Sequence, residues 1–415
     1  VRSSAACRRD RAQGLHRRDD GRELSNDVLI VGAGIAGLAA ALALARRGLT
    51  STVIERRALV DEEGAGIQIG PNGSRILAVL GVLDHVQAAA GVPEAIHLHD
   101  GATGRDLASI PLGDVIAARH GAPYLVAHRA DLHGALLAEA RRSPLVRIET
   151  DWPSARVIAD REAVTVRSVD GRIERASLVV GADGLWSGLR GQLFPGRRSR
   201  PRPTGLSAMR TVISRSGSPL AEAGDVHVWM RSGAHVVHYP VRGGRELALV
   251  LIAPLAVDDD GWARPVEKAL VEAAAARFPR PVRAGIAAGT AWRRHAIHRL
   301  APLPSFASGR IALVGDAAHP MAPYMAQGAV MALEDAIVLA RSIERHGATP
   351  AALERFSLDR RRRVQRVVRR SRLNGFVYHQ RRPWSLVRNL ILRASAGERL
   401  LASLDWLYGW RAPDD

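Results

Sequence analysis

Three glycines and one acidic residue near the start of the chain have the spacing of a phosphate-binding turn. Gly32, Gly34 and Gly37 follow a short apolar run, and Glu55 comes 21 positions after Gly34. Glycines let the backbone approach a pyrophosphate, a helix N-terminus stabilises its charge, and the carboxylate accepts hydrogen bonds from ribose hydroxyls. The pattern predicts a dinucleotide site, and its acidic residue favours an unphosphorylated ribose, as in FAD or NAD.

Two more acidic residues follow apolar runs, which places them at the ends of predicted strands. Asp183 lies in a Gly-Ala-Asp-Gly segment and Asp316 in a Gly-Asp segment. The Asp316 carboxylate can accept a hydrogen bond from a ribityl or ribose hydroxyl. Gly328, Ala329 and Val330 then open a helix, whose free backbone N–H groups can face an electron-rich ring carbonyl.

A histidine and a tyrosine are candidates for acid–base chemistry. His235 and Tyr239 are four residues apart on a predicted strand, so they face one side of it, whereas His238 faces the other. A base with a pKa near 7 can take the proton of a ring hydroxyl, which makes the ring more reactive toward an electrophile. A hydrogen-bonded core histidine is the alternative for His235, and the sequence leaves both open.

The residues around these candidates indicate the elements that hold them. Asp27–Val31 and Thr52–Glu55 are typical of parallel strands, with an alanine-rich helix between them that ends before Gly48. Val226–Trp229, His235–Gly244 and Glu246–Ile252 alternate as antiparallel strands do, and we expect them to form a second layer.

Composition excludes a disordered chain but leaves the charge to be explained. The 415 residues carry a formal charge of +18, with a single lysine among 59 basic residues. Such a charge can serve nucleic-acid or anionic-membrane binding, but the bias toward arginine favours a compositional origin, and we expect no nucleic-acid partner. Cys7 is the only cysteine and no zinc-type spacing occurs, so we expect no metal and a cytoplasmic protein.

One apolar stretch has the length of a membrane span. Val28–Ala45 runs for 18 residues without a charge. Its glycines and strand-like start argue against a transmembrane helix, and we predict none.

Taken in order, the segments around Gly32, Asp183 and Asp316 resemble the motifs of the class A flavoprotein aromatic hydroxylases. The resemblance covers about residues 26–380. It implies FAD as cofactor, NADH or NADPH as a transient co-substrate, and O2 that forms a flavin C4a-hydroperoxide. The expected reaction is hydroxylation of a small aromatic or N-heteroaromatic phenol or acid. Many relatives have Gly-Gln-Gly where this chain has Ala326-Gln327-Gly328, so we expect a less free loop here.

The resemblance also implies roles for individual residues. Arg129 would reach the flavin diphosphate, although an exposed helix arginine is the alternative, and Arg56 would lie by the adenosine. The helix start at Gly328 would face the flavin pyrimidine edge. Pro323 would lie near the hydroperoxide and contribute its backbone, and the His235–Tyr239 pair would bind substrate and take its proton.

The implied fold is α/β, with a Rossmann-like FAD-binding domain of the GR2 type, an inserted antiparallel-sheet substrate domain and C-terminal helices. We expect a disordered basic arm over residues 1–25 and a helical region over 346–415. The FAD-binding domain is predicted at residues 26–72, 97–185 and 292–345, and the substrate domain at 73–96 and 186–291.

The C-terminal region contains the densest positive charge. Residues 355–372 include nine arginines and one acid, with an apolar stripe that contains Phe356, Val364 and Val367. We expect an amphipathic helix packed across the flavin-binding part, with binding of anions as the functional alternative.

Other functions fit the same motifs. One alternative is an FAD-dependent oxygenase or reductase acting on an isoprenoid or polyketide, which would need a larger apolar tunnel. Another is a flavin-binding protein without oxygenase activity that associates with nucleic acid or membrane through its basic face. A homodimer is possible in each case.

Overall fold

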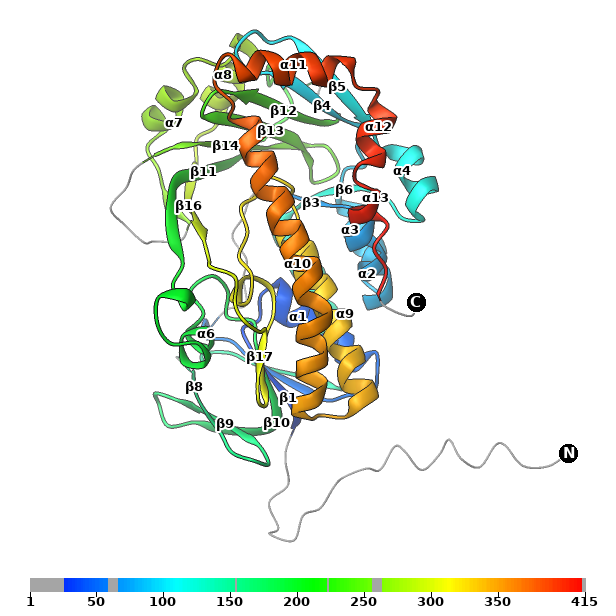
Figure 1. Cartoon of the computed structure of the whole chain (residues 1–415), viewed down its shortest axis with the longest axis vertical. Coiled ribbons are helices and arrows are strands. Elements are labelled where there is room, and N and C mark those ends of the chain that lie inside the picture. The colour runs from blue at the N-terminus through cyan, green and yellow to red at the C-terminus, as the bar shows by residue number, and fades with distance from the viewer. Residues whose placement is uncertain (1–25, 59–65, 154, 222–223, 256–262, 413–415) are drawn as a thin grey trace, which may run out of the picture.

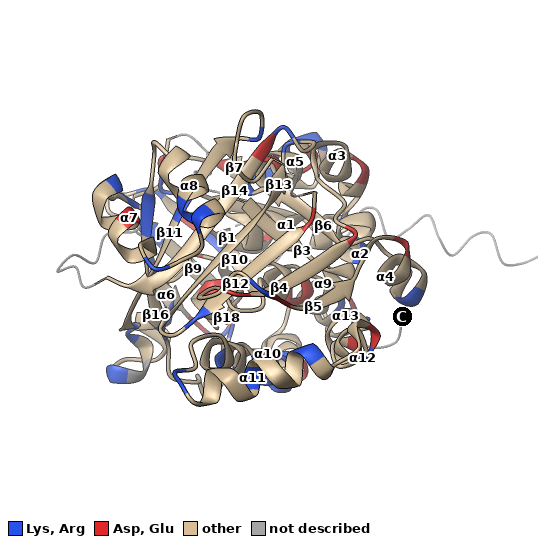
Figure 2. Cartoon of the chain, turned by 90° about the horizontal axis from the view of Figure 1, so that it is seen from above, with Lys and Arg blue, Asp and Glu red and all other residues tan. Residues whose placement is uncertain are grey.

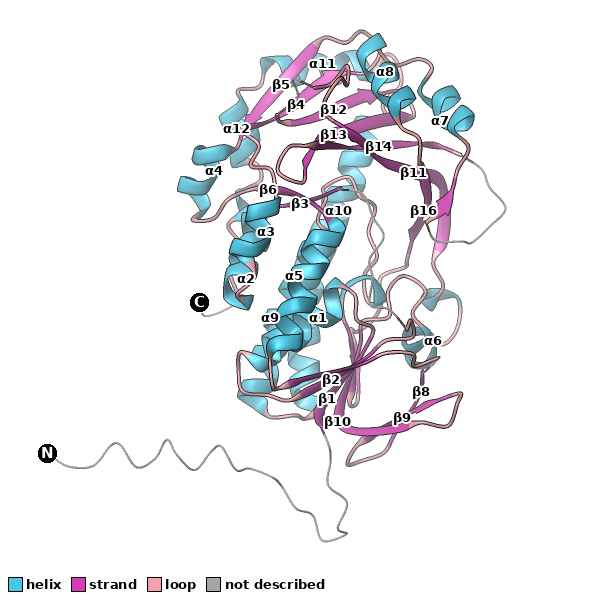
Figure 3. Cartoon of the chain, turned by 180° about the vertical axis from the view of Figure 1, so that it is seen from behind, coloured by secondary structure: helices cyan, strands magenta, loops and turns pink. Residues whose placement is uncertain are grey.

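The computed structural model describes residues 26–58, 66–153, 155–221, 224–255 and 263–412. Two eight-stranded sheets stand at opposite ends of this part (Figure 1). The long helices α5 (Arg129–Arg142), α9 (Gly328–His346) and α10 (Pro350–Tyr378) run between the sheets (Figure 3). The predicted arm, residues 1–25, lies outside the described residues.

The first sheet is the parallel core expected around the glycine turn. Its order is β17-β18-β10-β1-β2-β7, and β1 pairs in parallel with both β2 and β10. Val28, Leu29 and Ile30 are fully buried, as expected for a strand covered on both faces. The strands are β1 (Asn26–Val31), β2 (Ser51–Ile54), β7 (Val146–Glu149), β10 (Ile173–Gly181), β17 (Ala307–Ser308) and β18 (Ile311–Leu313), with the hairpin β8 (Ala155–Ala159) and β9 (Val164–Ser168) attached to β10.

The second sheet has the order β15-β16-β11-β14-β13-β12-β4-β5. The predicted strands β12 (Val226–Arg231), β13 (Ala234–Val241) and β14 (Glu246–Pro254) are confirmed and pair antiparallel. The sheet is antiparallel except between β12 and β4, which pair in parallel. The other strands are β4 (Ala95–Asp100), β5 (Asp106–Pro111), β11 (Arg202–Ser214), β15 (Arg264–Pro265) and β16 (Arg293–Arg299).

Strand pairing corrects part of the expected division of the chain. Strand β5 and most of strand β4 lie within residues 97–185, a range that we expected to belong to the FAD-binding domain. Both strands belong to the second sheet instead. Helices α2 (Pro71–Leu80) and α3 (Leu83–Ala89), assigned to the substrate part, pack on α9 and α5 instead. The reason is a long-range pairing, since Ile96 in β4 lies beside Val226 in β12.

The remaining elements connect or cover the two sheets. Helix α1 (Ile35–Ala45) packs against α5 and α9, and a short two-stranded sheet joins β3 (Gly66–Ile69) to β6 (Leu125–His128). The other helices are α4 (Gly113–His120), α6 (Gly188–Leu193), α7 (Lys268–Ala275), α8 (Arg280–Ala288), α11 (Trp384–Ala394), α12 (Gly397–Ala402) and α13 (Asp405–Tyr408). Figure 2 shows basic positions spread over α7, α8, α10 and α11.

The apolar stretch Val28–Ala45 divides into β1, the glycine turn and α1. Among the described residues, no helix combines the length and the hydropathy needed to cross a bilayer.

Candidate cofactor and substrate site

The glycine turn between β1 and α1 is shaped so that two of its glycines are required. Gly32 has a φ of +109°, and a Cβ on it would lie 2.5 Å from the Ala182 carbonyl oxygen. A Cβ on Gly37 would lie 1.9 Å from the Gly32 carbonyl oxygen. These distances are far inside van der Waals contact, so the turn closes only with glycine at both positions.

Gly34 differs from its two neighbours because space is open in front of it. A Cβ on Gly34 would meet nothing within 4 Å, and Gly34 caps α1 without a side-chain hydrogen bond. Gly34, Ile35 and Ala36 line a cleft between the two sheets, which we call the cofactor cleft. The uncapped first turn of α1 therefore presents free N–H groups and its positive dipole end to this cleft, which suits a pyrophosphate.

The predicted carboxylates differ in how much of their hydrogen-bonding capacity the protein uses. Glu55 is 6% exposed and its Oε2 accepts from the Ala33 N–H at 2.9 Å, so it braces the glycine turn. Asp183 Oδ2 accepts from the Leu189 N–H at 3.1 Å, whereas its Oδ1 is buried with no partner among the described residues. Burial raises the pKa of Asp183. Asp183 itself is not part of the lining of the cofactor cleft, although Ala182 and Gly184 on either side of it are, and Glu55 is not part of the lining either.

Other predicted cofactor residues are placed unequally. Arg129 at the start of α5 and Asp316 both line the cofactor cleft, and so do Gly328 and Ala329 at the start of α9. Val330 is fully buried and is not part of the lining. Arg56 is exposed and also lies outside the lining, so the structure does not bring it to the cleft.

A second cavity, of about 270 Å³, lies between the second sheet and the C-terminal helices. We call it the substrate cavity. Its wall includes apolar residues of β4, β12 and β13, with tyrosines and Arg370 on the opposite side. Five residues line both this cavity and the cofactor cleft: Gln68, His235, Val237, Pro323 and Ala326. A ring in the substrate cavity would therefore lie next to whatever occupies the end of the cleft.

His235 lies at this shared wall, and its hydrogen-bond partner is a histidine that the motifs did not indicate. It is 1% exposed, and its Nδ1 lies 2.8 Å from Nε2 of His379, the residue after α10. Burial, and secondarily the proximity of His379, lowers the pKa of His235 well below the usual value, not near 7 as expected. His235 is therefore neutral at pH 7, which is the proton-accepting form.

The neighbours of His235 on β13 have different surroundings. Tyr239 is 3% exposed and lines the cofactor cleft but not the substrate cavity, and burial raises its pKa, so it stays a neutral hydroxyl. His238 faces the other side of the sheet, where it stacks on His227 with ring centroids 4.7 Å apart and accepts from Trp229 Nε1. The described residues contain no group of His, Cys, Asp and Glu arranged to hold a metal.

Ala326 takes the conformation that glycine favours. Its φ is +52°, in the left-handed region, and it lines both cavities. The alanine therefore strains the loop before α9 as well as limiting its freedom.

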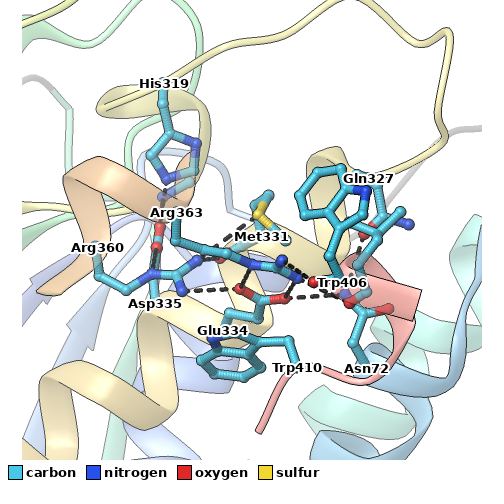
Figure 4. Close-up of polar contacts among 12 residues, drawn as sticks. Asn72, His319, Gln327, Met331, Glu334, Asp335, Arg360, Arg363, Trp406 and Trp410 are labelled. Carbon is cyan, nitrogen blue, oxygen red and sulfur yellow. Dashed lines mark hydrogen bonds and ion pairs between the residues drawn. The ribbon is translucent and has the colours of Figure 1, made fainter. Parts of the chain in front are cut away.

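The start of α9 is anchored by a buried charged network, which we call the α9–α10 network (Figure 4). Arg360 donates to Asp335 Oδ1 at 2.7 Å and to Glu334 Oε2 at 2.8 Å, and Arg363 donates to both Glu334 oxygens. His319 Nε2 lies 2.6 Å from Asp335 Oδ2 and so belongs to the same network. The network fixes the helix N-terminus that lines the cofactor cleft.

Three residues that line the two cavities or contact His235 were not predicted from the sequence: Arg210, Arg370 and His379. Arg210 on β11 lines the cofactor cleft and Arg370 on α10 lines the substrate cavity. The Nε atoms of both arginines are buried without a hydrogen-bond partner in the described part of the chain. No local pattern marks them, because they come from a strand and a helix that tertiary packing alone brings to the site.

Known proteins share this arrangement. A family model described as "FAD binding domain" matches residues 25–371. The chain is 34% identical over 388 residues to 3-hydroxybenzoate 6-hydroxylase 1 of Aquipseudomonas alcaligenes, with 93% of this chain and 98% of that protein covered. The chain belongs to this FAD-binding family.

Other members extend the comparison. The 6-hydroxynicotinate 3-monooxygenase of Bordetella bronchiseptica is 34% identical, covering 86% of this chain and 93% of that protein. The structure of Klebsiella pneumoniae HpxO complexed with FAD and uric acid has a TM-score of 0.82 at 27% identity, covering 92% of this chain and 96% of that one. The predictions of an α/β Rossmann-like fold, of FAD as cofactor and of an FAD-dependent monooxygenase are confirmed.

Proposed function

We propose that this monooxygenase hydroxylates a small aromatic or N-heteroaromatic phenol or acid, with NADH or NADPH as the reductant and O2 as co-substrate. The observation that carries the proposal is the wall of five residues shared by the cofactor cleft and the substrate cavity. Bound FAD would supply the activation of O2. The relatives named above act on a hydroxybenzoate and a hydroxynicotinate, which are single-ring acids bearing a hydroxyl group.

In this proposal the chain holds FAD through the features that fit it. The α1 N-terminus at Gly34 would hold the pyrophosphate, and Glu55 would accept from the ribose. Arg129, Asp183 and Asp316 would bind along the diphosphate and ribityl region, and the α9 start at Gly328 and Ala329 would meet the ring carbonyl edge. The Val330 N–H would belong to that same helix turn, whereas nothing in the cleft supports a role for Arg56.

His235 would remove the proton from the ring hydroxyl of the substrate. Its Nδ1 faces His379 at 2.8 Å, so with the proton on Nδ1 the lone pair of Nε2 is available to the substrate. The proton accepted at Nε2 would be balanced by passage of the Nδ1 proton to His379 Nε2. Tyr239 would remain a neutral hydrogen-bond donor, and Pro323 would contribute its backbone at the shared wall.

The size of the substrate cavity separates this proposal from the isoprenoid or polyketide alternative. About 270 Å³ holds one substituted ring, whereas a polycyclic or long-chain substrate needs a larger space. The proposal therefore predicts the best turnover with single-ring substrates.

The first experiment measures the flavin spectrum of the purified protein, then NADH and NADPH oxidation and O2 uptake with hydroxybenzoates and hydroxypyridines. We expect FAD, and nucleotide oxidation stimulated by one ring together with a hydroxylated product. Absence of product with every ring, or salt-dependent DNA binding without nucleotide oxidation, would overturn the proposal.

A second experiment tests the base. His235→Gln should lower kcat/KM about 100-fold or more, the usual contribution of a general base. His238→Gln is the matched control, because it lies on the same strand but faces away from the cavity. Since the pKa of His235 is lowered, the acid limb of kcat/KM should lie below pH 6.5. Equal activity of the His235→Gln and His238→Gln variants would show that His235 is not the base.

A further inference from the structure

A third cavity opens beside α10 and is lined by an unusual concentration of positive charge. It has a volume of about 1030 Å³ and lies between β11, β16 and the C-terminal end of α10. Among the described residues its lining contains no aspartate or glutamate, and it includes six arginines: Arg197, Arg200, Arg202, Arg299, Arg372 and Arg381. We call it the arginine groove.

The six arginines are exposed, and within the described residues the structure shows no ion pair between any of them and a carboxylate. Arg202 and Arg299 even oppose each other directly in the register of β11 and β16. Like charges in facing positions destabilise a sheet, so this arrangement has a cost that an anionic ligand would offset.

The inner end of the groove meets the site already described. Four residues line both the groove and the cofactor cleft: Ile297, His298, Pro320 and Met321. Tyr324 lines both the groove and the substrate cavity. A flat ring at this end would lie beside the cleft without entering the substrate cavity.

The groove also contains exposed aromatic side chains. Phe376 and Trp384 line it and are 68% and 65% exposed. Large aromatic side chains left open to solvent commonly serve as stacking surfaces for a ligand ring. The groove thus combines arginines, aromatic surfaces and an opening to the cofactor cleft.

We propose that the arginine groove binds the pyridine dinucleotide co-substrate. NAD(P)H has an adenine, a pyrophosphate and a nicotinamide, and these match the aromatic surface, the arginines and the opening at Pro320 and Met321. Because FAD would occupy the α1 N-terminus, a second dinucleotide needs a place of its own. This inference rests on the proposed use of NAD(P)H.

Two other anions compete for the same groove. A single-ring carboxylate carries one charge and matches the smaller substrate cavity, so six arginines exceed what it requires. Nucleic acid would be held by phosphate contacts along a broad basic surface, whereas here the charge lines a cavity that leads to the cofactor cleft. The dinucleotide therefore fits best, and the other two are outcomes of the test.

The test measures binding of tetrahydro-NADH and tetrahydro-NADPH, the redox-inert forms, to the FAD-loaded enzyme by titration calorimetry. Arg202→Gln/Arg299→Gln should raise Kd for at least one of them by a factor of about 10 or more, because charge-assisted hydrogen bonds to the pyrophosphate would be lost. Its melting temperature should not fall, since a like-charged pair is removed. Arg141→Gln/Arg167→Gln is the control with the same change of charge at exposed positions outside the groove, and it should leave Kd within about twofold.

A Trp384→Leu variant adds a second measurement, with a smaller rise in Kd from the loss of the stacking surface. Equal Kd values in the groove and control variants would overturn the inference. So would a change confined to KM for the aromatic substrate, or DNA binding that the groove variant alone abolishes. Failure of the proposed function is distinguishable, because the wild-type enzyme would then not oxidise NADH or NADPH with any ring.

Discussion

The two halves of α10 use the same residue type in opposite ways. In the first half, Arg360 is 1% exposed and is held by Glu334 and Asp335 of α9. In the second half, Arg370 lines the substrate cavity with its Nε buried and without a partner in the described part of the chain, and Arg372 lines the arginine groove. Both halves lie on one continuous helix of 29 residues.

The difference is explained by what faces each half. Where α9 presents two buried carboxylates, arginine charge is neutralised and serves the fold. Where α10 leaves α9 and passes the two cavities, no carboxylate of the described part of the chain lines either cavity, so the charge is available to an anionic ligand. The net charge of α10 therefore does not indicate the role of its arginines. The position of the carboxylates that face them does.

The strongest test of this contrast is Arg360→Gln. It would remove the guanidinium that bridges the two carboxylates, leaving Glu334 with Arg363 and Asp335 with His319. Removing one partner of a buried ion pair costs about 3–5 kcal/mol. We expect a loss of that size in the free energy of unfolding, measured by urea denaturation. Arg362→Gln, at an exposed position of the same helix, should change stability by less than about 0.5 kcal/mol. Comparable losses in both variants would contradict the contrast.

The sequence predicted the elements whose form depends on local residues. The glycine turn follows from Gly32 and Gly37 because side chains are sterically excluded there, and α9 begins at Gly328 as expected. The apolar stripe of α10 was also correct, since Phe356, Val364 and Val367 are buried. In each case the residues that define the element are close together in the chain.

What the sequence could not predict depends on contacts between distant residues. The parallel pairing of β4 with β12 puts β4 and β5 in the second sheet, and no local sequence pattern indicates this pairing. Arg360 and Arg370 cannot be told apart by sequence among the nine arginines of residues 355–372, although one is buried against α9 and the other lines a cavity. His379 reaches His235 only because α10 ends beside β13.

Arg370, in the second half of α10, should contribute to substrate binding and not to folding. Arg370→Gln is expected to raise KM for a carboxylated ring about 10- to 100-fold, as hydrogen bonds to a charged group contribute about 1.5–3 kcal/mol. Stability should be unchanged, because the buried Nε of Arg370 has no hydrogen-bond partner among the described residues. The measurement compares KM for the preferred acid with KM for its analogue without the carboxylate, which should not change. A fall in stability with KM unaltered would place Arg370 among the structural arginines.

Lowering the pH should reduce the stability that the α9–α10 network contributes through the first half of α10. Burial raises the pKa of Asp335, but His319 and Arg360 outweigh this, so its pKa lies below the usual 3.8. A carboxyl whose pKa is lower in the folded state contributes stability above about pH 4 and loses that contribution as pH falls through the folded pKa. The stability gap between wild type and Arg360→Gln should therefore stay nearly constant between pH 7 and about pH 4 and narrow only as the pH falls further, through the lowered pKa of Asp335. A gap independent of pH would show that Asp335 does not carry the effect.

The smallest effect is expected for a third kind of arginine on α10, one with a partner at the surface. Arg355 Nε lies 3.0 Å from Asp359 Oδ2, but its side chain is 60% exposed. Water screens such a pair, and ordering two long side chains offsets part of the attraction, so Arg355→Gln should cost only about 0–0.5 kcal/mol in urea denaturation. An ion pair at nearly the same distance as that of Arg360 would then contribute far less, which would show that burial against α9, and not pairing as such, makes the first half structural. A loss of about 3 kcal/mol would remove that distinction.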